Sequence, residues 1–157
     1  MCEISEIKSM KERLDSYRNL NIEIDNCVNR LDRLEEKIYN ISPSMHGESG
    51  SGKGSSSSNS KIQHIIESKE QLTEKMNSLI RYRTAESKAI EEIIEKLKNP
   101  DEKLIIYLRY FDNEKWSTIS EIMFGSEEDF IHNDNYMKKI FRIHSRALAN
   151  MGVIGSK

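Results

Sequence analysis

A short glycine-rich run is the first stretch of this sequence whose residue types could support chemistry. The segment Gly47–Lys53 has the spacing of a phosphate-binding loop, which cradles phosphates with backbone amides and a lysine. Gly54 stands where that loop needs serine or threonine to hold magnesium, and further serines follow in place of a clear helical pattern. We therefore interpret this run as part of a linker and not as a nucleotide site.

Histidine and cysteine are the other residue types that could act as ligands or catalysts. The four histidines are scattered along the chain, at His46, His64, His132 and His144. Cys2 and Cys27, the two cysteines, form neither a metal-ligand spacing nor a disulfide framework, which fits a cytoplasmic location. Because no nucleophile–base pair is evident, we expect no enzyme activity, metal, cofactor or small-molecule ligand. We expect His144 at the edge of the core, in a hydrogen bond.

The strongest candidate for a functional surface is a basic helix face near the C-terminus. Acids outnumber bases between Pro100 and His132, whereas Asp134 is the only acid from Asn133 to Lys157. Helical spacing places the candidate DNA-contacting residues on the polar side of one helix: Lys138, Lys139, Arg142, Ser145 and Arg146. Lysine and arginine can pair with phosphates or with guanine edges, so local positive charge matters more here than the net charge of −2.

The front part of the chain, residues 1–99, is predicted to be a helical coiled-coil hairpin. Apolar residues recur with a heptad period in two stretches, Glu3–Ile41 and Lys61–Asn99. The seam positions of the first stretch are Ile7, Met10, Leu14, Tyr17, Asn21, Ile24, Val28, Leu31, Glu35 and Ile38. Those of the second are Ile62, Ile65, Lys69, Leu72, Met76, Leu79, Arg83, Glu86, Ile90, Ile93 and Leu97, with a weak patch from Arg83 to Glu86.

The segment between these helices, residues 42–60, is rich in glycine and serine and is predicted to be a flexible linker. Such a linker lets the second helix fold back on the first, so the simplest arrangement is antiparallel. One hairpin buries little apolar surface, and we therefore expect a homodimer through the coiled coil. No stretch is apolar enough to cross a membrane, and we expect neither a membrane partner nor a secretory signal.

Residues 100–157 are predicted to form a separate domain of three helices. Asn99 and Pro100 mark the break before it, and Asp112-Asn113 signals a turn after the first helix. The first helix has its predicted apolar face at Leu104, Tyr107, Leu108 and Phe111. The second, near 115–124, has Trp116, Ile119, Ile122 and Met123 inward. The third is capped by Asn133 or Asp134, runs to about Met151 and has Tyr136, Ile140, Ile143, Ala147, Leu148 and Met151 inward. The whole chain is thus predicted to be all-α.

Three runs in this domain resemble the helix-turn-helix of sigma-factor region 4, most closely as it occurs in ArpU/RinA-type phage transcriptional regulators. The runs are Leu108–Tyr110, Trp116–Ile122 and Ile140–Leu148. The resemblance implies a sequence-specific DNA-binding regulator of a phage or mobile element, one that activates late genes. Its groove-facing positions fall on Tyr136, Met137, Lys138, Lys139, Phe141 and Arg142. We interpret Tyr136 and Phe141 as packing residues. The turn at 125–135 is longer than in that pattern.

Two alternative functions share parts of this interpretation. Small DNA-packaging (terminase) subunits also join a helix-turn-helix to a coiled coil, and they would assemble as rings. An adaptor that binds RNA polymerase with little DNA affinity of its own would instead use the acidic stretch between Pro100 and His132.

Overall fold

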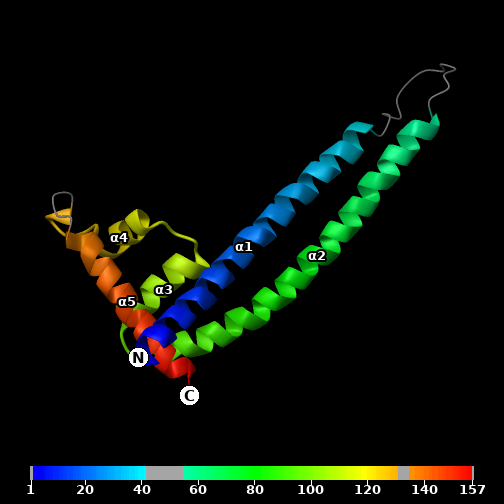
Figure 1. The fold of residues 1–157 in the computed structure, drawn as a ribbon. Coiled ribbons are helices and arrows are strands. Elements are labelled where there is room, and N and C mark those ends of the chain that lie inside the picture. The colour runs from blue at the N-terminus through cyan, green and yellow to red at the C-terminus, as the bar shows by residue number, and fades with distance from the viewer. Residues whose placement is uncertain (1, 42–54, 131–134, 157) are drawn as a thin grey trace. The chain divides into compact units, whose positions relative to one another are not determined.

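The computed structural model describes residues 2–41, 55–130 and 135–156, and these are almost entirely helical (Figure 1). The elements are α1 (Cys2–Ile41), α2 (Ser55–Glu95), α3 (Pro100–Ile106), the π-helical segment η1 (Tyr107–Phe111), α4 (Trp116–Phe124) and α5 (Asn135–Gly155). No strand occurs within the described ranges. The prediction of an all-α chain is confirmed.

The chain divides into two compact units. Unit 1 comprises residues 1–20 and 83–157, and unit 2 comprises residues 21–82. Both long helices, α1 and α2, therefore contribute residues to both units. The sequence places a boundary at Pro100 instead, because proline and asparagine mark where one helix ends but not which segments pack together.

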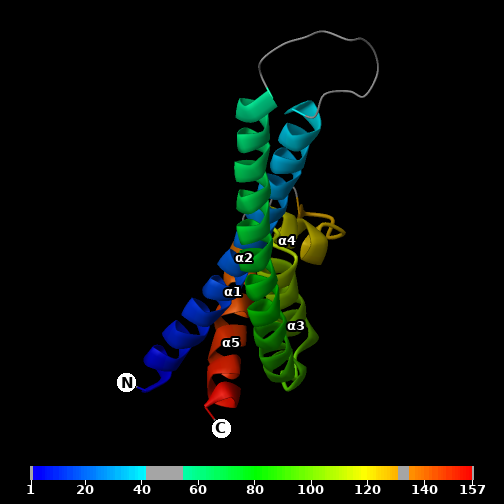
Figure 2. The ribbon, with the colours of Figure 1, turned by 90° about the vertical axis from the view of Figure 1, so that its right-hand side faces the viewer.

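The core of unit 1 is contributed by every helix of that unit. Figures 1 and 2 show α3 beside α5, and both α3 and α4 contact α5. The side chains with no exposed surface include Leu14 of α1, Ile90 and Ile94 of α2, Ile105 and Ile106 of α3, Ile119 of α4, and Ile140 and Met151 of α5. Burying each such side chain contributes about 1.5–3 kcal/mol, so this set constitutes a substantial hydrophobic core.

The inward side predicted for α5 is confirmed. Ile140, Ile143, Ala147, Leu148 and Met151 are buried, and Tyr136 is half-buried. These residues are spaced by three and four positions, which matches the helical period, and the opposite side of the helix carries charged residues.

The apolar faces predicted for α3 and α4 are partly wrong. Leu104 is 40 % exposed and Ile122 is 52 % exposed, whereas Ile105 and Ile106 are fully buried. The run Leu104–Phe111 is apolar on more than one side, so helical spacing alone does not choose the buried face. Neighbouring Glu102, also buried, belongs to the face that packs against α5.

Unit 2 consists of two helical segments, 21–41 of α1 and 55–82 of α2, that run antiparallel (Figure 1). Lys69 Nζ lies 2.7 Å from Glu35 Oε1, and Lys75 Nζ lies 2.7 Å from Glu23 Oε1. The lysine that comes later in α2 pairs with the glutamate that comes earlier in α1, as antiparallel neighbours require. Ile24, Cys27 and Leu72 are buried here.

The seam positions predicted in residues 61–99 are all buried or half-buried. The seam predicted for α1 is wrong at two positions of its second half. Val28 is 43 % exposed and Glu35 is exposed, whereas Cys27 is buried and Leu34 is half-buried. The inward row therefore advances by three residues from Tyr17 to Leu20 and keeps this offset, which is the mark of a stammer in a heptad pattern.

One further expectation for the long helices is corrected. Helix α2 begins at Ser55, so residues 55–60 are helical and not part of a linker. The remaining predicted linker residues, 42–54, lie outside the described residues. The weak patch from Arg83 to Glu86 is continuous helix, and the half-buried Glu86 carboxylate accepts a hydrogen bond from Arg13 Nε. None of the described helices is long and apolar enough to cross a membrane.

Candidate nucleic-acid interface

Helix α5 packs its apolar side against the rest of unit 1 and exposes its charged side to solvent. All five candidate residues are exposed: Lys138, Lys139, Arg142, Ser145 and Arg146. The buried residues beneath them include Ile140 and Ile143, which fix the rotation of the helix about its axis. The sequence-predicted surface therefore exists as one continuous helix face.

Lys138 and Arg142 are the most available cations of this face. They are one helical turn apart, and no described acidic group lies within ion-pair distance of either side chain. A cation without a protein partner keeps its full charge for a phosphate, and neutralising phosphates is the main source of affinity for nucleic acid. These two residues therefore carry the candidate interface.

Arg146 differs because a buried carboxylate lies beneath it. Its Nε is 3.9 Å from Oε1 of Glu102, whose side chain is only 3 % exposed, while the Arg146 side chain itself is 61 % exposed. Asn150 Nδ2 donates to Glu102 Oε2 over 2.8 Å. Glu102 thus connects α3 to two residues of α5, and Arg146 helps to balance its charge. We assign Arg146 both a structural and a surface role.

The N-terminal turns of α5 are held by aromatic contacts. Lys139 Nζ lies 4.5 Å from the ring centroid of Phe124, and the ring centroids of Phe124 and Tyr136 are 5.3 Å apart. The Tyr136 hydroxyl donates to Asp129, and this hydrogen bond raises the pKa of Tyr136 to about 12. The interpretation of Tyr136 as a packing residue is thus confirmed. The Lys139 ammonium also makes a cation–π contact with Phe124.

Phe141 packs less fully than expected. Its ring centroid lies 5.2 Å from that of Trp116, yet 45 % of its surface is exposed. It sits one residue before Arg142 and enlarges the exposed part of α5 with an apolar patch. Met137, the other apolar position carried over by the resemblance, is half-buried.

His144 lies at the edge of the core, as predicted. It is 7 % exposed, and its Nε2 is 3.0 Å from the Tyr110 hydroxyl in a buried hydrogen bond. Burial, together with the nearby positive charges of Lys11 and Arg109, lowers the pKa of His144 to about 4. The imidazole is therefore neutral at physiological pH and serves to position α5 against η1.

Sequence reasoning missed Arg109, which supports the aromatic cluster under α5. Its guanidinium carbon lies 4.6 Å from the Trp116 ring centroid, and its Nη1 donates to the Glu114 carbonyl over 2.9 Å. The pattern of apolar residues gives no signal for such a residue, because its role depends on a ring seven positions away. Arg109 thereby links η1 to the first turn of α4.

The turn between η1 and α4 occurs where Asp112-Asn113 predicted it. Asn113 has a φ of 63°, a left-handed conformation that asparagine tolerates better than most residues. Arg18 Nε donates to Asn113 Oδ1 over 2.7 Å. The turn is therefore fixed by α1 as well as by its own residue types.

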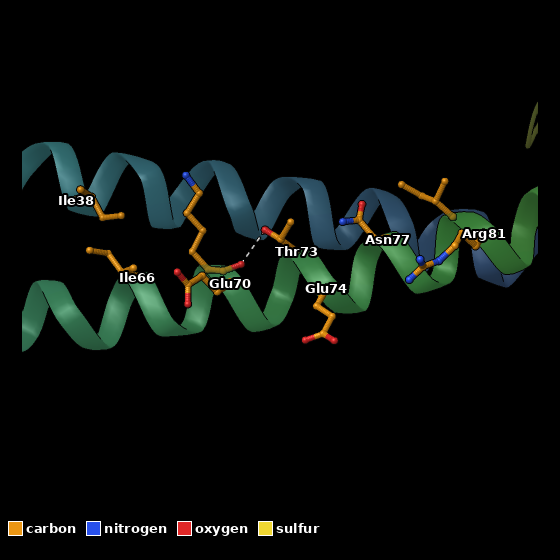
Figure 3. A pocket seen from close by; sticks show the side chains of 9 residues that line it. Ile38, Ile66, Glu70, Thr73, Glu74, Asn77 and Arg81 are labelled. Atoms are coloured by element: carbon orange, nitrogen blue, oxygen red, sulfur yellow. Dashed lines mark hydrogen bonds between the residues drawn. The ribbon is translucent and has the colours of Figure 1, made fainter.

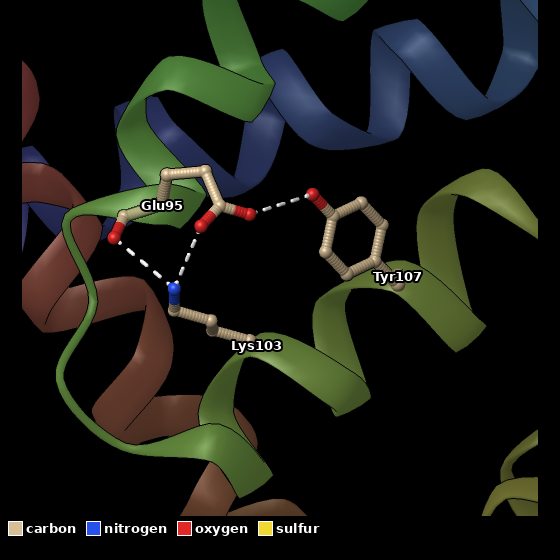
Figure 4. A network of polar contacts seen from close by, with 3 residues as sticks. All are labelled: Glu95, Lys103 and Tyr107. Carbon is tan, nitrogen blue, oxygen red and sulfur yellow. Dashed lines mark hydrogen bonds and ion pairs between the residues drawn. The ribbon is translucent and has the colours of Figure 1, made fainter.

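The start of α3 is anchored to the end of α2 by a polar network (Figure 4). Lys103 Nζ donates to the Glu95 carboxylate over 2.9 Å and to the Glu95 carbonyl over 3.1 Å, while the Tyr107 hydroxyl donates to the same carboxylate. The hydrogen bond and positive charge of Lys103 lower the pKa of Glu95. Asn99 caps α3 by accepting from the Asp101 amide.

The connection from α4 to α5 spans residues 125–134, between Phe124 and Asn135. Its described part contains turns at 125–130. The predicted caps of α5, Asn133 and Asp134, lie outside the described residues. A connection of this length exceeds the short turn of a compact helix-turn-helix.

Comparison with protein-family models, with curated protein sequences and with solved structures finds no match for this chain.

Proposed function

We propose that this protein binds double-stranded DNA through the exposed face of α5 and acts as a transcriptional regulator of a phage or mobile element. The observation that supports it is the pairing of Lys138 and Arg142 on a continuous helix face, each without an acidic partner among the described residues. Ser145 adds a hydroxyl donor to the same face, and such groups commonly contact phosphate oxygens.

In the proposed mechanism, α4 and α5 act as a helix-turn-helix of the sigma region 4 type, with α5 as the recognition helix. The aromatic contacts of Trp116 and Phe124 hold α4 against α5. Lysine and arginine side chains near the start of a recognition helix reach phosphates and base edges of the major groove. The resemblance to ArpU/RinA-type regulators adds the proposal that binding activates late genes.

The long helices α1 and α2 are proposed to form a coiled-coil hairpin that supports this DNA-binding part. No nucleic-acid role is assigned to them, because their exposed surfaces mix acids and bases. The ion pairs of unit 2, Lys69 with Glu35 and Lys75 with Glu23, already use opposite charges within the hairpin.

The first test compares duplex affinity of the full chain with that of the double variant Lys138→Ala/Arg142→Ala. The variant should bind about thirtyfold more weakly or worse, because each lost base contact is worth about 1–3 kcal/mol and every 1.4 kcal/mol is about tenfold in affinity. The matched control is Lys37→Ala/Lys88→Ala, which removes the same net charge from exposed positions of α1 and α2.

Fluorescence anisotropy with a labelled duplex measures both affinities at one salt concentration, and circular dichroism checks that each variant remains helical. Equal weakening in the two double variants would show that net charge, and not the face of α5, governs binding. Selection of bound duplexes from a random pool then tests for a preferred sequence, which a regulator requires.

A further inference from the structure

Unit 2 contains a long groove between its two helical segments. The groove has a volume of about 870 Å³ and is lined by Ile38 of α1 and by residues of α2 from Ile66 to Arg81 (Figure 3). Ile38 and Ile66 point toward one another near one end. All of its lining residues belong to unit 2, so the groove is a feature of the two-helix pair itself.

The two-helix pair leaves much of its apolar surface accessible to water. Among the described residues of unit 2, only Ile24, Cys27 and Leu72 are buried. The remaining inward apolar side chains of the described segments are half-buried: Leu31, Leu34, Ile38, Ile62, Ile65, Ile66, Met76, Leu79 and Ile80. Two helices alone cannot enclose such a set, whereas a bundle of four helices can.

Helix α2 carries one more row than a two-stranded coiled coil needs. Beside the seam positions, Ile66, Thr73 and Ile80 recur every seven residues and are all half-buried. A stripe widened by such a row is typical of helices that face the core of a bundle, because a two-helix seam uses only two rows. The additional row therefore points to a further helix on this side.

The row is symmetric about its own centre. Ile66 precedes Thr73 by seven residues and Ile80 follows it by seven, so a two-fold axis at Thr73 brings Ile66 of one copy opposite Ile80 of the other. The Thr73 hydroxyl donates to the Lys69 carbonyl over 2.8 Å, which satisfies its donor within the helix. Its methyl group can then lie on the axis without an unpaired polar hydrogen.

The charges of the groove are balanced and self-complementary. Lys69 and Arg81 supply positive charge, while Glu70 and Glu74 supply negative charge. An antiparallel copy places Lys69, which also pairs with Glu35 of its own chain, within one helical turn of the partner's Glu74. A surface that meets itself across a two-fold axis needs both signs in this way, whereas a one-signed groove would repel its own copy.

We propose that a second copy of this chain docks antiparallel on the groove, with the two-fold axis at Thr73, to form a four-helix bundle from two hairpins. This dimer does not depend on DNA binding by α5. It goes beyond the proposed function by naming the surface and symmetry of the assembly.

The decisive experiment is disulfide crosslinking of the full chain at the axis. In a Cys2→Ser/Cys27→Ala background, Thr73→Cys should form a disulfide between copies under mild oxidation, because residues on a two-fold axis approach their own equivalents. The product would run at twice the chain mass of 18.3 kDa in a non-reducing gel. Ser78→Cys is the matched control, since Ser78 is exposed on the same helix but off the axis.

Efficient crosslinking at position 73 with little at position 78 would support the dimer. Equal crosslinking at both positions, or none at 73, would overturn it. A second measurement uses light scattering over a range of concentrations, where the wild-type chain should show a dimer and Ile66→Lys/Ile80→Lys a monomer. A wild-type monomer or a larger ring would also overturn the proposal, and neither result would depend on duplex binding.

Discussion

The two units use the same heptad pattern with different results. In unit 1, the seam of α2 is covered by further helices, and its residues Ile90 and Ile93 are buried. In unit 2, the same helix continues the pattern through Met76 and Leu79, yet these residues are only half-buried. The pattern therefore shows which side of a helix turns inward, while the number of neighbouring helices determines how completely that side is removed from water.

A core truncation gives the largest expected contrast between the units. Ile140→Ala in unit 1 should lower the free energy of unfolding by about 2–5 kcal/mol, because it leaves a cavity at a fully buried site. Leu79→Ala in unit 2 should have an effect that grows with protein concentration as the proposed dimer forms. Urea unfolding at several concentrations measures both. A large, concentration-independent loss for Leu79→Ala would mean that the hairpin needs no second copy.

The pH dependence of stability should reside in unit 1. His144 has a folded pKa of about 4, below its ordinary value of 6.5, so the unfolded chain takes up a proton first as the pH falls. Stability is complete above pH 6.5 and decreases between 6.5 and 4, by up to about 3 kcal/mol. His144→Gln should flatten this region in urea titrations at a series of pH values. An unchanged slope in that variant would assign the pH dependence to other groups.

The buried carboxylate of Glu102 should contribute less than the core but more than any exposed acid. Glu102→Ala removes the acceptor of Asn150 and the counter-charge of Arg146, and hydrogen bonds to charged groups are worth about 1.5–3 kcal/mol. Glu92→Ala, at an exposed position of α2, is the control and should be nearly neutral. Thermal unfolding compares the two variants. Similar melting temperatures would show that Glu102 does not connect α3 to α5.

The turn at Asn113 should give the smallest effect. Asn113→Ala places alanine in the left-handed region, which asparagine tolerates better, at a cost of about 1–2 kcal/mol, and it removes the bond to Arg18. Asn113→Gly removes the same bond without the strain. The difference in unfolding free energy between these variants therefore isolates the backbone conformation, and a difference of zero would contradict the left-handed turn.

The sequence predicts the parts of this molecule in which one face is clearly distinct from the other. The inward side of α5 and the seam of α2 are of this kind, and His144 could be placed at the core edge because its neighbours have helical spacing. The buried side of the run Leu104–Phe111 could not be predicted in this way, because the run is apolar on several sides. A fixed heptad predicts Val28 to face inward, because it does not include the three-residue spacing between Tyr17 and Leu20.

The contacts that depend on distant residues could not be predicted. Glu102 is buried because Asn150 and Arg146 reach it from α5, and Arg109 is placed by Trp116. A charged residue within an apolar run gives no sign of such a partner. Local spacing is enough to predict that the five candidate residues of α5 face solvent, although the sequence does not show that Arg146 and Lys139 have partners.

The most direct test of the proposed DNA-binding surface is the salt dependence of duplex binding by the full chain. Each phosphate contact contributes about 0.9 to the slope of log affinity against log salt concentration. The wild-type chain should show a steep slope, and Lys138→Ala/Arg142→Ala should reduce it by about 2, while Lys37→Ala/Lys88→Ala leaves it unchanged. A wild-type chain that binds no duplex at low salt, or equal slopes in all three proteins, would contradict the assignment of α5 as the DNA-binding surface.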